Sequence, residues 1–282
     1  MSLTDLHTHT TRSDGTLTPI ELVEAALRAG VRTLAVTDHD RVFEAPEASQ
    51  AAARQGLDLI CGIELSCRHE GRTVHLLGYF FNGVDRSGFD AWLNQLLDSR
   101  RDRNRRLAAR LRDLGVAIEL EEAESYGHGL TGRPHFARVL MDKGYVASLR
   151  EAFDRYLGES APGYVERDSP DVPHAVRRML AAGAVASLAH PVRLAGRDPA
   201  RQEQIIRGFA ESGLTAIEAF HSDHAPADAE RFVAIAGKYG MAVSGGSDFH
   251  GANKPGVELG TGVKGNLRVP DWVVPALRQR AG

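Results

Sequence analysis

The chain has 282 residues, and its 34 basic and 37 acidic residues leave a net charge of −3. The length fits one large domain or a domain with a sizeable insertion, and the balanced charge excludes bulk electrostatic binding of nucleic acid. Twelve histidines stand beside only two cysteines. A disulfide framework and a thiolate zinc site are therefore excluded, and any unusual chemistry rests on imidazoles and carboxylates.

Short apolar runs predict seven strands, with helical patterns between most of them. The first helix has clear boundary signals, because Thr18 is a typical N-cap, Pro19 a typical first residue, and Gly30 lies past its end. Alternating strands and helices predict an α/β fold with a parallel sheet, and seven strands are enough for a closed or nearly closed barrel. The predicted strands are residues 3–7, 33–37, 57–63, 74–81, 184–189, 214–220 and 242–246, and the predicted helices are 18–30, 44–55, 170–183, 199–212 and 226–239.

Residues 84–170 interrupt this alternation, because they contain no convincing strand. Helical patterns recur there near 134–143 and 148–157, and leucines recur at helical spacing with arginines on the other face. We expect a barrel formed by residues 1–83 and 171–282, with 84–170 as a helical lid that contributes to substrate binding. The leucines are Leu93, Leu96, Leu97, Leu107, Leu111 and Leu114.

Histidines and acids gather at the strand ends. His7 and His9 end the first strand, and residues two apart on an extended chain point to the same side, so both imidazoles can bind one cation. In a parallel barrel the carboxyl ends of the strands meet on one face, where active sites form. The further candidates are Asp14 in the first loop, Asp38, His39 and Asp40 after strand two, Glu64 ending strand three, His75 opening strand four, His190 ending strand five, Glu218 and His221 ending strand six, and Asp248 and His250 ending strand seven.

These donors suit Mn²⁺, with Zn, Fe or Co as alternatives. About ten groups exceed what one ion needs, so two or three ions are expected, and clustered ions serve hydrolysis of phosphate esters or amides. Two interpretations fit some of these side chains. Asp38 and Asp40 either orient the imidazole of His39 or form a turn. Glu218 is either a group next to the metal ligands or a buried acid near the metals, and it is left unassigned. His69, His128 and His174 match no motif and are expected at the surface.

Six motifs follow one another along the chain: HTHTxxSDG (7–15), TDHD (37–40), GIELS (62–66), VHLLGY (74–79), AHP (189–191) and SDFH (247–250). In this order they resemble the PHP (polymerase and histidinol phosphatase) family of the amidohydrolase superfamily. The resemblance implies a distorted seven-stranded (β/α)7 barrel with a helical insertion. It also implies three metal sites: one held by His7, His9, Glu64 and Asp248, a second by Glu64 with His75 and His190, and a third by Asp14, His39 and His250.

Three further segments resemble those of stand-alone family members that act on nucleotides: RDRN (101–104), TGRPHFAR (131–138) and EAFHSDH (218–224). The likeness implies removal of the 3′-phosphate from nucleoside 3′,5′-bisphosphates, such as 3′-phosphoadenosine 5′-phosphate, and action on short 5′-phosphorylated RNA. Arginines of the insertion suit a phosphate remote from the metals, although residues 100–106 equally fit a solvated helix face. His135 also fits a plain helix start after Pro134, and His221 and His224 fit a loop as well as they fit the substrate pocket. The predicted substrate contacts are Arg103, Asn104, Arg133, His135, His221 and His224, with Arg101, Arg105 and Arg106 as further guanidinium groups.

We expect catalysis by a hydroxide that bridges two metals, with Glu64 and Asp248 essential. Either His221 or a metal-bound water protonates the leaving 3′-oxygen, and His221 is the favoured candidate. Three alternatives remain: a phosphatase for histidinol phosphate or another small molecule, a C–N amidohydrolase, and a metal-binding proofreading or regulatory module. The intact ligand set argues against the module. No signal peptide or spanning segment is visible, so we expect a cytoplasmic enzyme with no membrane contact and infer no obligate protein partner.

Overall fold

Seven strands form one mixed sheet with the order β1-β2-β3-β4-β5-β6-β7 in a computed structural model that describes residues 3–127 and 130–281. Each strand therefore pairs with its neighbours in sequence, as a barrel built from consecutive units requires. The strands are β1 (Leu3–Asp5), β2 (Val31–Val36), β3 (Asp58–His69), β4 (Arg72–Phe80), β5 (Val185–Leu188), β6 (Ala216–His221) and β7 (Ala242–Gly246), and a separate pair is formed by β8 (Val257–Glu258) and β9 (Gly262–Val263).

The expectation of an entirely parallel sheet is wrong at β4. Strands β1 to β3 and β5 to β7 run parallel, but β4 is antiparallel to both neighbours. Only Glu70 and Gly71 connect β3 to β4, and both have positive φ, 48° and 76°. Two such residues form a tight hairpin turn, whereas a parallel crossover needs about a dozen residues.

The first and last strands of the sheet approach each other beside the histidine motifs. The amide of Leu6 donates to the carbonyl of Gly245 at 3.1 Å, and Thr8 forms an isolated parallel bridge with Phe249. These contacts bring the segment after β1 alongside the segment after β7. The continuous ladder runs only from β1 to β7, so closure into a full distorted barrel stays a prediction.

The helices between strands follow the predicted order. Thr18 caps the first one, accepting from the Glu21 amide while the Glu21 carboxylate accepts from the Thr18 amide. None of the described helices combines the length and apolar character that crossing a membrane requires. They are α1 (Pro19–Arg28), α2 (Pro46–Arg54), α3 (Phe89–Asp113), α4 (Leu120–Tyr126), α5 (Arg133–Asp142), α6 (Leu149–Ala152), α7 (Val172–Ala181), α8 (Pro199–Glu211), α9 (Pro226–Lys238) and α10 (Val273–Arg278), with the shorter turns η1 (Phe153–Leu157), η2 (Pro191–Arg197) and η3 (Gly251–Asn253).

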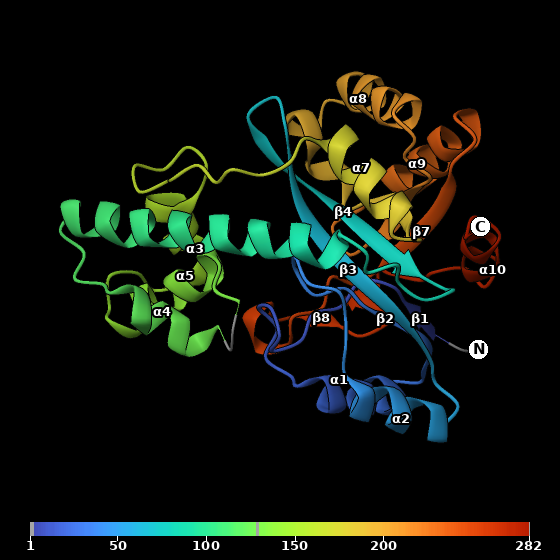
Figure 1. The fold of residues 1–282 in the computed structure, drawn as a ribbon, viewed down its shortest axis with the longest axis horizontal. Helices are drawn as coiled ribbons and strands as arrows, with labels where there is room; N and C mark the ends of the chain where they lie inside the picture. The colour runs from blue at the N-terminus through green and yellow to red at the C-terminus, as the bar shows by residue number, and fades with distance from the viewer. Residues whose placement is uncertain (1–2, 128–129, 282) are drawn as a thin grey trace.

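Helix α3 connects the sheet to a smaller group of helices. Between β4 and β5 the described residues form no strand, as predicted, and α4 and α5 lie beside one end of α3, away from the sheet (Figure 1). Trp92 of α3 packs in the large core around the sheet, whereas Leu107 and Leu111 pack in a separate core with Phe136. Leu114 is exposed rather than buried. The domain boundaries at residues 84 and 170 stay a prediction.

Candidate metal centre

Two fully buried histidines after β1 face the same pair of carboxylates. The Nε2 atoms of His7 and His9 each lie 3.1 Å from Glu64 Oε2 and 3.6 Å from Asp248 Oδ1. The spacing of two residues on extended chain thus brings both imidazoles to one point, as predicted. These four side chains offer one buried ligand atom each, close enough together for a single ion.

Glu64 lies at the middle of this centre. It is not at the end of β3, as predicted, but in the middle of that strand, because the hairpin extends β3 to His69. Its carboxylate is 1% exposed and contacts imidazoles on both oxygens. Oε2 lies near His7, His9 and His39, the last at 3.3 Å, and Oε1 lies 2.7 Å from His75 Nδ1 and 3.2 Å from His190 Nε2.

The structure also brings together the three residues predicted for a third ion. Asp14 Oδ1 is 3.2 Å from His250 Nε2, and Asp14 Oδ2 is 3.7 Å from His39 Nε2. His9 belongs to this group as well, with its Nδ1 3.8 Å from Asp14. His39 therefore faces both Asp14 and Glu64, which makes the groups continuous.

Glu64, His75 and His190 were predicted to hold one ion together, but the structure brings each histidine close to Glu64 without placing all three ligand atoms in one close group. Both histidines contact Glu64, and their ring centroids lie 5.3 Å apart. The group of closely spaced ligand atoms that contains His75 includes His39 instead of His190. The assignment of individual residues to individual ions stays a prediction.

Hydrogen bonds orient several imidazoles toward the centre. His7 Nδ1 lies 2.9 Å from Glu218 Oε1, and His250 Nδ1 lies 2.8 Å from the carbonyl oxygen of Asp248. Because these oxygens only accept, Nδ1 carries the proton in the neutral form of each ring, and Nε2 then keeps its lone pair. Glu218, which the sequence reasoning left unassigned, thus contacts a candidate ligand from outside the centre.

The donor set fits more than one divalent transition-metal ion. Six buried polar atoms that converge here have no hydrogen-bond partner among the described residues, which is costly unless an ion satisfies them. Imidazole and carboxylate donors without thiolate suit Mn, Zn, Fe or Co. The six atoms are Nε2 of His7 and His9, Nδ1 of His39 and His75, Oε2 of Glu64 and Oδ1 of Asp14.

Proton affinities in the centre differ sharply between neighbours. Burial disfavours a charged His9, but Asp248 and Glu64 outweigh it and raise the pKa of His9 to about 9. Burial lowers the pKa of His39 to about 4, against the pull of Glu64 and Asp14. A histidine must lose its proton before it binds a metal, so ion binding at His9 is expected to release a proton at neutral pH.

Asp38 and Asp40 flank His39 in the sequence, but their side chains bond to other residues and not to its imidazole. Asp38 accepts from the Thr10 amide at 2.8 Å and from the Ser13 hydroxyl at 2.6 Å, which orders the loop that carries Asp14. Asp40 is fully buried and accepts from Arg100 and from Arg167 Nη1, the latter at 2.7 Å. Burial would raise the pKa of Asp40, but these two arginines hold it well below its usual range.

Replacing Asp40 by alanine is expected to destabilise the protein by about 3–5 kcal/mol, because Arg100 and Arg167 are left as buried charges without a partner. Chemical denaturation of D40A and wild type measures this difference. The matched control is Asp102→Ala, which removes an exposed partner of Arg105 on the same helix as Arg100 and should leave the midpoint unchanged. Equal midpoints for D40A and D102A would contradict the prediction.

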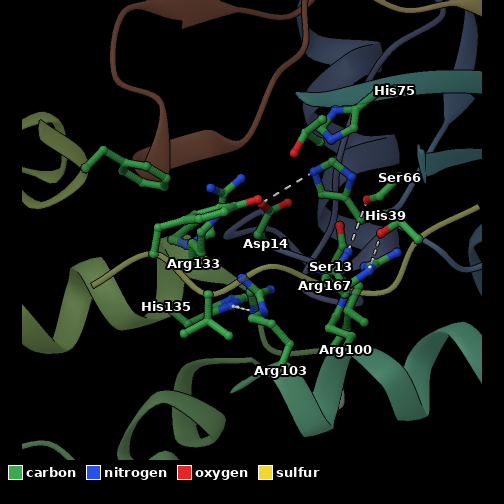
Figure 2. Close-up of a pocket in the computed structure, with 18 of the residues that line it drawn as sticks. Ser13, Asp14, His39, Ser66, His75, Arg100, Arg103, Arg133, His135 and Arg167 are labelled. Atoms are coloured by element: carbon green, nitrogen blue, oxygen red, sulfur yellow. Dashed lines mark hydrogen bonds and ion pairs between the residues drawn. The ribbon is translucent and has the colours of Figure 1, made fainter. Parts of the chain in front are cut away.

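A cavity of about 310 Å³ opens beside the metal centre. Figure 2 shows His39 and His75 toward one end of it, and Arg103, Arg133 and His135 toward the other. Arg100 and Arg167 also line the cavity, next to Asp40. The lining therefore combines candidate metal ligands with six guanidinium groups, because Arg68 and Arg193 belong to it as well.

The arginine run of α3 divides between the interior and the solvent. Arg103, a predicted substrate contact, is buried in the cavity wall, whereas Arg101, Arg105 and Arg106 are exposed. Helical periodicity explains the division, because positions three and four apart share a face. Asn104 is buried, but it lines a neighbouring cavity, where its amide donates to the Thr131 carbonyl at 2.8 Å.

Three further predicted histidines lie at different places. His135 lines the cavity, and its Nδ1 accepts from the Gly132 amide at 2.9 Å. His221 is buried, with Nδ1 accepting from the Asp223 amide at 2.9 Å and Nε2 3.5 Å from Asp248 Oδ2. His224 is buried outside the lining, with its Nδ1 2.7 Å from the Ala219 carbonyl.

Three other histidines, which match no motif, were expected at the surface. His174 is exposed and His69 is half-buried, and His128 lies outside the described residues.

The chain is similar to known proteins over most of its length. The chain matches the PHP domain family over residues 5–156. It is 35% identical over 266 residues to the 3′,5′-nucleoside bisphosphate phosphatase of Chromobacterium violaceum, covering 92% of this chain and 91% of that protein. It is 33% identical over 273 residues to the 5′-3′ exoribonuclease of Haemophilus influenzae, covering 96% of each. A solved amidohydrolase structure from Chromobacterium violaceum, with bound sulfate and no metal, has a TM-score of 0.85 at 34% identity and covers 99% of this chain and 97% of that one.

Proposed function

The chain belongs to the PHP domain family and is a metal-dependent phosphoesterase, and we propose that its substrates are nucleoside 3′,5′-bisphosphates such as 3′-phosphoadenosine 5′-phosphate. Hydrolysis breaks the bond between the 3′-oxygen and phosphorus and transfers the phosphoryl group to water. The products are inorganic phosphate and the 5′-mononucleotide. The similarity to the 3′,5′-nucleoside bisphosphate phosphatase of Chromobacterium violaceum supports this choice.

The observation that carries the proposal is an excess of positive charge opposite the metal centre, on the buried Arg100, Arg103 and Arg167 and the half-buried Arg133. Arg100 and Arg167 share the single carboxylate of Asp40, and no ion pair of Arg103 or Arg133 is found among the described residues. Burial and the neighbouring arginines lower the pKa of Arg103 well below its usual value. Buried charges without partners are costly, so a polyanionic ligand is expected to complete this end of the cavity.

Two anion sites in one cavity fit a ligand with two phosphates. When bound, the metal ions supply the Lewis acidity that phosphate ester hydrolysis requires. Arg103 and Arg133 hold the second phosphate, since planar guanidinium groups bind phosphate oxygens in pairs. His221 Nδ1 accepts from the Asp223 amide, so Nε2 carries a proton that we assign to the leaving 3′-oxygen. The same arrangement accepts the 5′-phosphate of short RNA, in line with the relative named a 5′-3′ exoribonuclease.

The other candidate functions fit the cavity less well. Histidinol phosphate carries a single phosphate and a cationic amine, and the six guanidinium groups of the cavity would repel the amine. A C–N amidohydrolase has no need for an arginine-lined end, and a proofreading or regulatory module has no need for a complete buried ligand set. Both the arginines and the ligand set are therefore best explained by hydrolysis of a bisphosphate.

A phosphate-release assay with Mn²⁺ tests the proposal directly. It compares nucleoside 3′,5′-bisphosphates, their 2′,5′-isomers, 5′-mononucleotides and histidinol phosphate. Cleavage of 5′-phosphorylated oligoribonucleotides releases 5′-mononucleotides instead of inorganic phosphate, so chromatography of the products follows it separately. The 3′,5′-bisphosphates are expected to have the highest kcat/KM among the small molecules. Equal kcat/KM values for all of them would contradict the proposed specificity and leave a phosphatase without selectivity.

Replacing Arg133 by alanine is expected to raise KM for the 3′,5′-bisphosphate by about ten- to a hundred-fold, because hydrogen bonds to charged groups contribute about 1.5–3 kcal/mol. KM for 4-nitrophenyl phosphate, which lacks the second phosphate, should change little. Arg105→Ala is the matched control, since Arg105 is exposed on the outer face of α3. An equal increase in KM for both substrates would show that Arg133 does not bind the second phosphate.

A further inference from the structure

We propose that Glu218 is a positioning residue that sets two candidate metal ligands, His7 and His190, at the same time. The inference rests on the proposed metal centre and concerns a residue outside its ligand set. Glu218 is fully buried in β6, next to a register irregularity between Glu218 and Phe220. Such irregularities redirect side chains out of the regular alternation of a strand. Both of its carboxylate oxygens are bonded, each to a different histidine.

The first oxygen fixes the ring of His7. Oε1 lies 2.9 Å from His7 Nδ1, and as a carboxylate oxygen it can only accept. The proton of the neutral ring is therefore held on Nδ1, which leaves the lone pair of Nε2 facing Glu64 and Asp248. Without this acceptor either nitrogen could carry the proton, and only one of the two forms binds an ion.

The second oxygen fixes the backbone of His190, which has an unusual conformation. Its φ is 30° and its ψ is 58°, a left-handed conformation that an L-residue keeps only when its surroundings hold it. Asp40 and Asp248 also have positive φ, and backbone carbonyls hold their amides, Glu64 O and His7 O, each at 2.8 Å. The amide of His190 instead donates to a side chain, Glu218 Oε2, at 2.6 Å.

Glutamine cannot replace this carboxylate, although it has nearly the same shape. If its oxygen accepts from the His190 amide, its NH₂ group faces His7 Nδ1 and forces the ring proton onto Nε2, the atom directed at Glu64. If the side-chain amide is reversed, two donors meet at the backbone of His190. Either orientation misplaces one candidate ligand, so Glu218→Gln is expected to weaken ion binding without removing any ligand.

Titration calorimetry of the metal-stripped proteins with Mn²⁺, together with elemental analysis of bound metal, tests this inference without an activity assay. We expect Glu218→Gln to lower the affinity of at least one site by about 10- to 100-fold. The control is Tyr79→Phe, which removes an equally buried polar atom from β4 and should bind Mn²⁺ like wild type. Binding by E218Q equal to wild type would overturn the inference alone. A wild-type protein that binds no ion would overturn the proposed function and the inference with it.

If Glu218→Gln does not fold, the protonated ring nitrogen of His7 in the wild-type protein tests the inference. Nitrogen chemical shifts of ¹⁵N-histidine-labelled wild type, with His7 assigned by its loss in His7→Gln, report which ring nitrogen is protonated. The inference predicts a proton on Nδ1 of His7 in the metal-loaded protein. A proton on Nε2 would overturn it.

Discussion

Replacing Glu64 by glutamine is expected to lower turnover more than about a thousand-fold while the protein stays folded. Loss of one preorganised group that stabilises the transition state costs about a hundred- to a thousand-fold, and Glu64 contacts five imidazoles that belong to different candidate ion sites. The neutral amide keeps the size of the side chain but removes the charge that attracts the ions. Weaker ion binding and weaker catalysis should therefore appear together.

Steady-state kinetics with a 3′,5′-bisphosphate and Mn²⁺, combined with elemental analysis of bound metal, measure both effects. The control is Glu70→Gln, the same substitution in the exposed turn that ends β3, which should keep wild-type kcat and metal content. A thermal unfolding curve for each variant separates loss of fold from loss of site. Wild-type metal content and wild-type kcat in E64Q would show that Glu64 is not a metal ligand.

Much of the candidate site could be predicted because its residues lie in short motifs with constrained spacing. Two histidines separated by one residue on extended chain must point the same way, and the ends of parallel strands must lie together, whatever the rest of the fold does. His7, His9, Asp248 and His250 follow β1 and β7 and meet for these reasons. Their prediction required no knowledge of packing.

Features that depend on contacts between distant segments could not be predicted. The two-residue turn at Glu70 and Gly71 contains one glycine and one residue with no strong turn preference, so the hairpin and the central position of Glu64 were missed. Alternation of strands and helices also carries no signal for strand direction when no helix intervenes. The pattern of apolar runs predicted the strands but not the reversal at β4.

Polar residues in the interior show the same limit. Arg103 and Arg105 belong to one charged run, and only the orientation of α3 decides which enters the cavity and which faces solvent. Glu218 lies 211 positions along the chain from His7, and its two hydrogen bonds exist only in the folded sheet. Helical periodicity could have divided the arginines once the face of α3 that contacts the sheet was known.

Replacing His221 by asparagine is expected to lower kcat for the 3′,5′-bisphosphate by about a hundred- to ten-thousand-fold, the usual contribution of a general acid. The asparagine oxygen can still accept from the Asp223 amide, as His221 Nδ1 does at 2.9 Å, so the local fold is preserved and the Nε2 proton is lost. The loss should be much smaller for 4-nitrophenyl phosphate, because its leaving group departs without protonation.

A glutamine at the same position distinguishes proton transfer from positioning of Asp248. His221 Nε2 lies 3.5 Å from Asp248 Oδ2 and outside the lining of the cavity, so the histidine could act by holding this carboxylate. The amide nitrogen of His221→Gln takes a place close to that of Nε2 and still donates, but it cannot act as an acid. If His221 is the general acid, H221Q and H221N lose kcat equally and only with the poor leaving group. If H221Q instead recovers kcat, or if kcat falls equally on the bisphosphate and on 4-nitrophenyl phosphate, His221 acts by holding the Asp248 carboxylate and is not the general acid.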